Sequence, residues 1–262
     1  VVLSGNSDPK KDVVIFGHNY TGDLKDGQRH GNGKYIYPNG DTYDGMWNFD
    51  EKSGEGTFTF NNDSRTYIGA FENNVFNGWG TLYIIGGEKY EGEWKNNQMN
   101  GEGKYFYPYG NTYSGEWKNG KKEGKGTYTY TFGGSYTGDW INDKKHGKGI
   151  STDGQGNSYE GDYAYGEMEG DGIYKFKSGN TYRGTFLKGK KHGQGNFSYN
   201  NGDSYVAYVF AHDNQSFGDA GNQSVIKCDS FTGNGNSNGP TINLGFEPQY
   251  ILTKNKDRNQ DW

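Results

Sequence analysis

Residues 90–112 read YEGEWKNNQMNGEGKYFYPYGNT, and residues 113–135 follow with YSGEWKNGKKEGKGTYTYTFGGS. Both stretches begin with tyrosine and place glycine third and an aromatic residue fifth. A Gly-x-Gly pair and alternating aromatic residues come after these. A pattern that recurs at a fixed period of about 20 to 50 residues indicates a repeat protein. The repeat therefore decides the fold.

Tyrosines set the register of the repeat, and positions within each repeat are numbered from its tyrosine. Consecutive repeats begin 23 residues apart, except for one interval of 24 residues that ends at Tyr67. Eight repeats keep the pattern, and a ninth replaces the third-position glycine by Ala207. The repeats begin at Tyr20, Tyr43, Tyr67, Tyr90, Tyr113, Tyr136, Tyr159, Tyr182 and Tyr205.

Within each repeat the aromatic residues and glycines alternate with polar residues, which predicts β-strands with one buried face. Tyr90, Gly92 and Trp94 share a face of the first predicted strand. The glycines at positions 3 and 14 point the same way as the rings, so we expect neighbouring rings to lie on bare backbone there. Asn-Gly in PNGD (38–41) and in NNGD (200–203) predicts tight hairpins between repeats.

Aromatic residues have to form the core, because the chain is otherwise very polar. It has 23 Tyr, 15 Phe and 6 Trp in 262 residues, with a mean hydropathy of -1.09. A single repeat buries too little surface to offset its ordering entropy, so repeats must stack. The net charge of -5 and the pI near 5.6 argue against a nucleic-acid partner.

These observations predict an all-β fold: an elongated, single-layer antiparallel meander of about eight hairpin repeats, followed by part of a second β-rich module. Its open edges require covers. The predicted division is an N-terminal cap or linker at 1–19, repeats at 20–204, a degenerate repeat and linker at 205–221, and the start of a C-terminal β-module at 222–262.

The pattern Y-x-G-x-W followed by G-x-G-x-Y-x-Y over residues 20–204 resembles the MORN (membrane occupation and recognition nexus) repeat family. The resemblance implies a twisted, single-layer sheet of hairpins. It also implies a role as a scaffold, dimerisation module or membrane-proximal tether. A minority of family members carry an attached enzyme domain, and nothing in this sequence matches one.

Candidate chemical groups are better explained by the repeat than by catalysis. His30, His146 and His192 stand at position 11 of three separate repeats, too far apart for a metal site, and we predict that they are hairpin-turn residues. The Gly-x-Gly pairs lead into strands, whereas a dinucleotide-binding loop leads into a helix. We therefore predict no catalytic, cofactor-binding or metal-binding residues, and no cofactor.

A column of carboxylates is likewise better explained by the repeat than by catalysis. We assign these carboxylates to position 4 and expect them to face solvent, opposite the rings. The column is Asp23, Asp44, Glu93, Glu116, Asp139 and Asp162.

Paired lysines at positions 9 and 10 are the most suggestive polar feature. We place them on a long loop, where they would line one edge of the sheet and meet an anionic membrane or a phosphate-rich partner. Acidic residues interleave with them, which favours ordinary solvated turns. The pairs are Lys121–Lys122, Lys144–Lys145 and Lys190–Lys191.

The structural residues of the central repeats are predicted to form an aromatic ladder, in which each ring packs on a neighbouring repeat. The ladder is Tyr90, Trp94, Tyr113, Trp117, Tyr136 and Trp140. The sixth repeat departs from the pattern by placing Ser151 and Asp153 where aromatic residues belong. This irregularity predicts a weak point, a bend or a contact site.

After Tyr205 the 23-residue period ends. The segment TGNGNSNGPTINLGFEPQYILTK resembles a β-rich module of bacteriophage tail-fibre and other virion proteins. The chain begins without methionine and stops soon after this segment, so we expect a piece of a longer polypeptide. TINLGF and YILTKN are expected to pair near the strand of Tyr205.

The leading functional hypothesis is a non-enzymatic scaffold in a virion, such as a phage tail or fibre component, with other protein chains in a symmetric homo-oligomer or virion assembly as partners. A cellular scaffold that tethers a membrane or cytoskeletal partner is the first alternative. A regulatory repeat region of a larger enzyme is the second.

Overall fold

A computed structural model describes residues 11–15 and 18–209, which fall into two compact bodies divided between Lys144 and Lys145. Both bodies are built from antiparallel β-strands. The only helical element among the described residues is a single 3₁₀ turn, η1 (Pro108–Gly110). The predicted linker and C-terminal module beyond residue 209, including TINLGF and YILTKN, lie outside the described residues.

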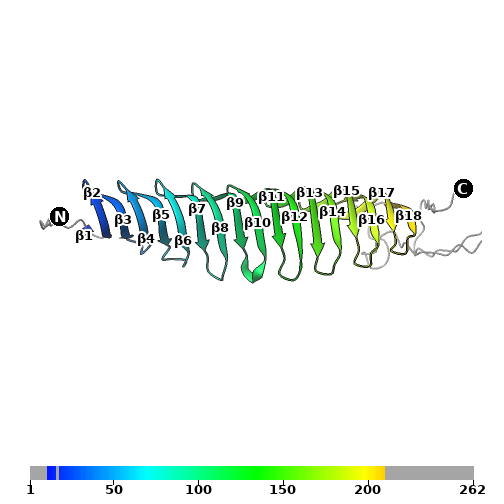
Figure 1. Cartoon of the computed structure of the whole chain (residues 1–262), viewed down its shortest axis with the longest axis horizontal. Helices are drawn as coiled ribbons and strands as arrows, with labels where there is room; N and C mark the ends of the chain where they lie inside the picture. The colour runs from blue at the N-terminus through cyan, green and yellow to red at the C-terminus, as the bar shows by residue number, and fades with distance from the viewer. Residues whose placement is uncertain (1–10, 16–17, 210–262) are drawn as a thin grey trace, which may run out of the picture. The chain divides into compact units, whose positions relative to one another are not determined.

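In the N-terminal body each strand pairs with the next one along the chain, as the stacked arrows in Figure 1 show. Two strands make one repeat, and strand β1 precedes the first. The strands are β1 (Lys11–Ile15), β2 (His18–Lys25), β3 (Gln28–Ile36), β4 (Thr42–Asn48), β5 (Glu51–Thr59), β6 (Thr66–Glu72), β7 (Val75–Tyr83), β8 (Lys89–Lys95), β9 (Gln98–Phe106), β10 (Thr112–Lys118), β11 (Lys121–Thr129) and β12 (Gly134–Ile141).

The C-terminal body continues the same pattern of neighbouring antiparallel pairs. Its last strand belongs to the ninth, degenerate repeat, where Ala207 pairs with Gly195. The all-β, single-layer meander predicted from the sequence is thus confirmed. The strands are β13 (Lys144–Asp153), β14 (Ser158–Ala164), β15 (Glu167–Lys175), β16 (Thr181–Leu187), β17 (Lys190–Ser198) and β18 (Ser204–Val209).

The first-position tyrosines form the core of both bodies. All eight, from Tyr20 to Tyr182, are at most 2% exposed. Each hydroxyl donates a hydrogen bond to the main-chain oxygen at position 4, as Tyr90 does to Glu93 at 3.0 Å. The ring lies on the α-carbon of the glycine at position 14, so that a β-carbon added to Gly103 would overlap the Tyr90 ring. The glycine therefore provides the space that the ring fills.

Aromatic residues at position 5 join one repeat to the repeat before it. Trp117 packs edge-on against Tyr113 of its own repeat and Tyr90 of the preceding one, at centroid distances of 5.1 and 5.4 Å. Its indole N–H donates to the main-chain oxygen of Gly103 at 3.2 Å. Trp94 and Trp140 make the equivalent bonds to position-14 glycines. Because each contact crosses a repeat boundary, stacking and folding are one process.

Two kinds of turn alternate along the chain. Within a repeat, positions 7 and 8 both have positive φ, as at Asn119 (50°) and Gly120 (78°), which defines a type I′ two-residue hairpin. Between repeats, Gly40 has φ 86° and donates to the Tyr37 oxygen, which closes a three-residue loop. Asn-Gly at 38–41 thus forms a hairpin, but not the two-residue one that this signal favours.

The within-repeat turn is shorter than the sequence suggested, and this corrects two predictions. None of the three lysine pairs lies on a long loop, because Lys121, Lys144 and Lys190 open strands β11, β13 and β17, and the second lysine of each pair follows within the strand. The histidines are not turn residues either. His30 and His192 lie inside strands β3 and β17, and His146 lies inside β13.

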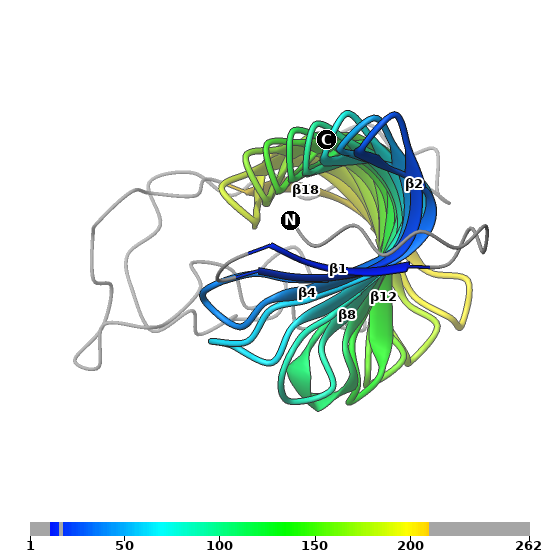
Figure 2. The same ribbon diagram turned by 90° about the vertical axis from the view of Figure 1, so that its left-hand side faces the viewer.

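Bulges bend the strands of most repeats. The pairing shifts by two residues after position 3: between the pairs Gly92–Gly103 and Trp94–Met99, strand β8 has one residue and strand β9 has three, and extra residues on one strand bend that strand. Seen end-on in Figure 2, the strands of the N-terminal body are curved, and β4, β8 and β12 fan out in order as a twisted sheet requires.

Replacing Gly103 by alanine should strongly destabilise the N-terminal body. The new methyl group would overlap the buried Tyr90 ring and has no free space into which to move. We expect a loss of about 3 kcal/mol or more in the free energy of unfolding, measured by urea denaturation. The control is Gly120→Asn, which has open space and a turn position that Asn74 and Asn97 occupy in other repeats. Equal stability of the two variants would contradict this packing.

The tyrosine core should also make the fold sensitive to alkali. Burial raises the pKa of Tyr20 and Tyr37 from 10.0 to about 12, and burial raises the pKa of Tyr67 and Tyr90 as well. A raised folded-state pKa contributes stability that is complete below the unfolded value and is lost as the pH rises through the folded value. We expect the free energy of unfolding to fall steeply above about pH 10. In a pH titration, most tyrosinate absorbance should appear together with the loss of the β-sheet circular dichroism signal. Ionisation of these tyrosines well before unfolding would contradict the burial.

Candidate interaction surface

Most rings at positions 16 and 18 are only partly covered and form the accessible part of the aromatic face, whereas Phe58 is buried at 9% exposed. We call them the aromatic row. In the N-terminal body they contact one another within and between repeats: Tyr105 and Tyr107 are 4.6 Å apart, and Tyr107 and Tyr128 are 5.5 Å apart. The row there consists of Tyr35, Tyr37, Phe58, Phe60, Leu82, Ile84, Tyr105, Tyr107, Tyr128 and Tyr130.

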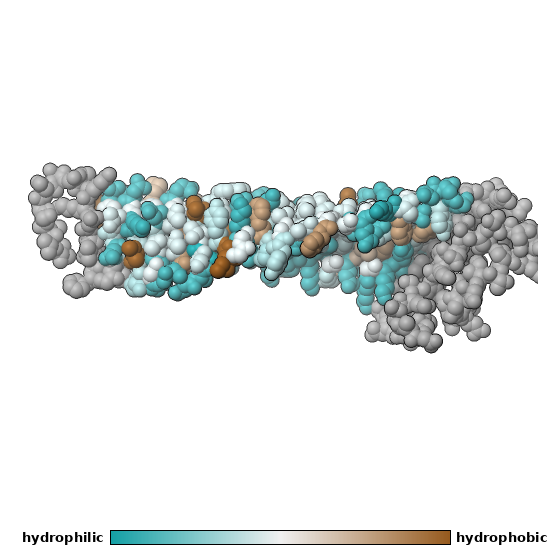
Figure 3. Space-filling view, turned by 90° about the horizontal axis from the view of Figure 1, so that it is seen from below, coloured by the Kyte–Doolittle hydropathy of each residue, from teal (hydrophilic) through white to brown (hydrophobic). Residues whose placement is uncertain are grey.

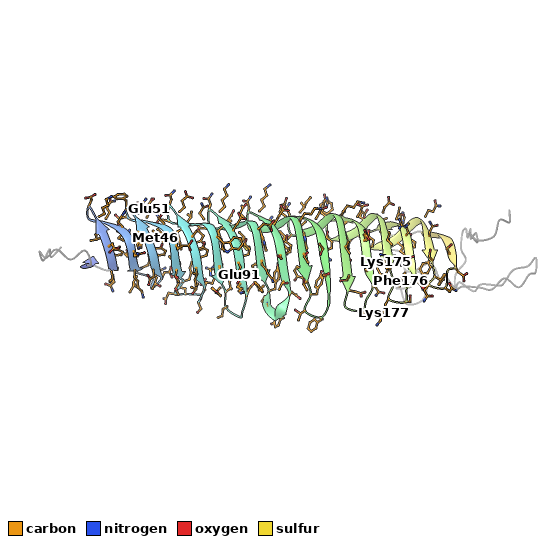
Figure 4. All side chains as sticks on the ribbon, viewed as in Figure 1. Met46, Glu51, Glu91, Lys175, Phe176 and Lys177 are labelled. Carbon is orange, nitrogen blue, oxygen red and sulfur yellow. The ribbon has the colours of Figure 1, made fainter. Side chains whose placement is uncertain are left out.

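The third repeat divides this row into two aromatic stretches. Leu82 and Ile84 stand there in place of rings. In the C-terminal body, Tyr174, Phe176, Phe197 and Tyr199 form a similar connected set, with neighbouring centroids 4.8 to 5.6 Å apart. In Figure 4 Phe176 lies between Lys175 and Lys177, near the connection that leads to the next repeat.

Cations at position 10 lie over the rings of this face. Lys52 Nζ is 4.8 Å from the Phe58 centroid and 5.4 Å from the Tyr37 centroid. Lys122 Nζ is 5.3 Å from Trp140 and 5.5 Å from Tyr107. Such distances favour cation–π attraction. Met99, Met168 and Phe76 take the same position in other repeats, so the site also accepts uncharged apolar side chains.

The two lysines Lys52 and Lys122 occupy nearly identical surroundings. The Lys52 ammonium donates to the Tyr37 hydroxyl at 3.2 Å, and the Lys122 ammonium donates to the Tyr107 hydroxyl at 3.1 Å. The Lys122 side chain is only 13% exposed. Burial, and then the charge of Arg29, lower the pKa of Lys52. Each cation is therefore held in a largely apolar setting.

Position 8 of the following repeat supplies a counter-ion to some of these cations. Asp50 lies 2.8 Å from the Arg29 guanidinium, and Asp143 lies 3.7 Å from Lys122 Nζ. Beside Lys52 the same position is Asn74, whose side-chain oxygen accepts the Lys52 main-chain N–H at 2.9 Å. Among the described residues, no carboxylate lies within ion-pair distance of Lys52 Nζ.

This geometry separates the two members of each predicted lysine pair. Lys121, Lys144 and Lys190 are exposed, whereas Lys122, Lys145 and Lys191 are half-buried, with their ammonium groups within 6 Å of ring centroids. The second lysine of each pair thus belongs to the aromatic face. Sequence reasoning missed this role, because it placed both lysines in a loop.

The carboxylates of position 4 bond to the main chain of the neighbouring strand. Glu93 accepts the N–H of Glu102 at 3.1 Å, and Glu116 accepts the N–H of Lys125 at 2.8 Å. Asp23 and Asp162 make the equivalent bonds. Asp44 was assigned wrongly, because it stands at position 2 of its repeat and Met46 holds position 4.

The irregular sixth repeat contains a matched substitution. Ser151, which replaces a ring, accepts the hydroxyl hydrogen of Tyr163 at 2.7 Å, and Tyr163 itself replaces the usual tryptophan. Asp153 accepts two main-chain N–H groups, from Gln155 and Asn157, in the next turn. Both unusual residues therefore have local structural partners.

The histidines do not come together in the structure. His30 packs on Phe49 at 4.9 Å, and His146 packs on Tyr165 at 5.7 Å. In the part of the chain that the structure describes, no group of three or more His, Cys, Asp or Glu side chains is arranged to hold a metal ion.

The face opposite the rings is polar, with scattered apolar residues. Trp79 is 60% exposed there, and Ile68 and Met46 are 47% and 46% exposed. Figure 3, seen from below Figure 1, shows apolar and hydrophilic residues interspersed along this side of the molecule.

Comparison with family models identifies two regions. The MORN repeat model matches residues 20–42, 43–65, 90–112, 113–134 and 136–158, which confirms five of the eight repeats predicted from the sequence. A model described as a domain of unknown function, DUF7483, matches residues 170–262. It begins within the seventh repeat, well before residue 222. No comparison confirms a resemblance of the C-terminal segment to a phage tail-fibre module.

Solved structures with a similar arrangement include the TCP10 domain of Danio rerio CPAP in complex with a peptide of Danio rerio STIL, at 13% identity and a TM-score of 0.47. That match covers 78% of this chain and 91% of the other. The TCP domain of SAS-4 (dCPAP) from Drosophila melanogaster, in complex with a proline-rich motif of Ana2, matches at 10% identity, covers 79% and 94% of the two chains, and has a TM-score of 0.35. Likenesses this distant carry no argument about function.

The curated proteins gave no match. Within residues 11–15 and 18–209, the structure has no helix of sufficient length and hydrophobicity to cross a membrane.

Changing Asn74 to aspartate should stabilise the N-terminal body, because it would give Lys52 the counter-ion that Asp143 gives Lys122. We expect a gain of about 0.5 kcal/mol in the free energy of unfolding, smaller at high salt. The Asp143→Asn variant should lose a similar amount of the free energy of unfolding. Urea denaturation at low and high salt measures both, and a destabilised Asn74→Asp variant would contradict the proposed equivalence of the two sites.

Proposed function

We propose that this chain is a non-enzymatic scaffold that binds other protein chains along its aromatic row. The observation that carries this proposal is that most rings at positions 16 and 18, such as Tyr105, Tyr107 and Tyr128, remain partly exposed while they contact one another within and between repeats. Accessible aromatic side chains are enriched in protein interfaces, because they bury much apolar area at a low entropic cost. The repeats fix the spacing of these rings.

The polar side chains of the repeats support a structural role. The carboxylates at position 4 bond main-chain groups, and the cations at position 10 lie over rings. An anionic membrane partner gains little support from the lysine pairs, because only the first lysine of each pair is exposed. The exposed lysines remain a weaker hypothesis for such a partner.

The virion role is a hypothesis about where such a scaffold acts. Its basis is the sequence of the C-terminal segment, which lies outside the described residues. Detection of the chain in purified phage particles, in symmetric copies, would support it. Recovery from cellular complexes alone would favour the cellular scaffold, and a longer reading frame with a catalytic domain would favour the enzyme-region alternative.

Replacing Tyr107 and Tyr130 by serine should abolish partner binding without unfolding the chain, because both rings are partly exposed. The matched control replaces Ile68 and Trp79 by serine on the opposite face. Affinity capture from the native source, followed by mass spectrometry, compares both variants with the wild type. We expect at least one protein to be lost from the row variant and retained by the control. Circular dichroism must show that both variants are folded. Identical captured proteins for all three chains would overturn the proposal.

A further inference from the structure

Lys52 is the starting point, because it is a half-buried cation with no carboxylate at ion-pair distance among the described residues, and the negative charge of Asp41 acts on it only from farther away. The structurally equivalent Arg29 and Lys122 each have an aspartate from the following repeat. Asn74 holds that place beside Lys52 and offers a neutral oxygen to the main chain. Desolvating a cation without a counter-ion is unfavourable. An anionic group from outside the chain would therefore complete the charge balance at this site.

The rings beside Lys52 indicate what else a ligand must contain. Tyr37 and Phe58 are 5.6 Å apart, and Phe58 and Phe60 are 4.7 Å apart, so that the three rings form a short connected strip. The Lys52 ammonium lies over Tyr37 and Phe58. At the other end of the strip, the Arg65 guanidinium lies 4.5 Å from the Phe60 centroid. A complementary ligand has flat or compact apolar groups with a carboxylate between them.

The spacing of the rings suggests the backbone of that ligand. Tyr37 and Phe60 hold position 18 of neighbouring repeats, so they are separated by two strands, or about 9.6 Å. A polyproline II helix repeats every three residues, or about 9.3 Å. Prolines three residues apart would therefore meet successive rings, with an intervening residue near Lys52. Rigid polyproline segments also lose little entropy on binding to aromatic surfaces.

We propose that the strip of Tyr37, Phe58 and Phe60, together with Lys52, docks an acidic, proline-rich segment of a partner protein. Prolines pack on Tyr37 and Phe60, which flank the buried Phe58, and a carboxylate pairs with the Lys52 ammonium. This inference rests on the proposed scaffold function and specifies the class of partner for one part of the aromatic row. Glu51, which precedes Lys52, lies at the edge where the within-repeat turns gather (Figure 4).

Fluorescence anisotropy of the full chain with a labelled peptide of about four Glu-Pro-Pro triplets tests the proposal. A Lys-Pro-Pro peptide tests the need for negative charge, and a Glu-Gly-Ser peptide tests the need for the polyproline helix. We expect binding of the first peptide and at least roughly tenfold weaker binding of the other two. Equal binding of the acidic and basic peptides, or no binding of the acidic proline peptide, would overturn the proposal.

Substitutions at position 8 provide matched controls. Asn74→Asp gives Lys52 a counter-ion from the chain itself and should weaken binding of the Glu-Pro-Pro peptide by roughly fivefold or more. Asn97→Asp makes the same change at an equivalent turn, where the side chain bonds the Phe76 N–H and no lysine is present, and should leave affinity unchanged. Lys52→Met, which introduces the residue that Met99 supplies at this position, should abolish binding and keep the fold.

Lys122 allows a gain-of-function test of the same proposal. Asp143→Asn removes its counter-ion and should create a second site of the same kind, visible as a doubled stoichiometry. Unequal effects of Asn74→Asp and Asn97→Asp support the proposal, and equal effects overturn it. Should the peptide fail to bind while serine variants of Tyr107 and Tyr130 still lose their captured partner, this inference falls and the scaffold function stands.

Discussion

A tyrosine ring lying on a glycine α-carbon is the contact on which the rest of the structure depends. Each such ring is buried on the aromatic face of a single sheet, although no second layer of secondary structure covers it in the described residues. Its hydroxyl remains satisfied by the oxygen at position 4, as in Tyr43 to Met46 at 2.8 Å. The glycine allows the close approach, and position 5 of the next repeat then covers the ring edge. Burial without a second layer requires this combination, because a side chain larger than hydrogen at position 14 would lift the ring into water.

The same arrangement explains how one face can contain both the core and the proposed binding surface. Position 1 is almost fully buried throughout, as is position 5 except at Leu24, whereas positions 16 and 18 lie nearer the connecting turns and are mostly partly exposed, with Phe58 buried. Cations at position 10 bridge the two zones. Lys122 and Arg29 each form an ion pair with an aspartate of the same chain, and Lys52 does not. Small differences at position 8 thus distinguish repeats that otherwise share one backbone.

The sequence predicted the features that depend on spacing alone. Tyrosine, glycine and tryptophan at fixed positions were sufficient for the strands, for the aromatic face and for the resemblance to MORN repeats. Placement of the turns was harder, because Asn-Gly occurs both at 39–40 and at 119–120, and only the second forms a type I′ hairpin. Because of this error, the prediction placed the lysine pairs in a loop. It therefore missed the strand alternation that directs Lys122 towards the aromatic face. The pairing of Asn74 with the preceding repeat joins residues 22 apart in sequence, which no local pattern reveals.

Ser151 and Tyr163 also limit how this gene can vary. Repeats 4 and 5 present the same core residues to their neighbours, so unequal recombination that adds or removes one 23-residue copy there would preserve the ring contacts at each boundary. The junction between repeats 6 and 7 is different, because its hydrogen bond needs a serine on one side and a tyrosine on the other. A tryptophan repeat moved next to Ser151 would leave that hydroxyl without its donor. A change of copy number in the middle of the array would therefore keep the ring contacts, whereas separating repeats 6 and 7 would remove the hydrogen bond between Tyr163 and Ser151.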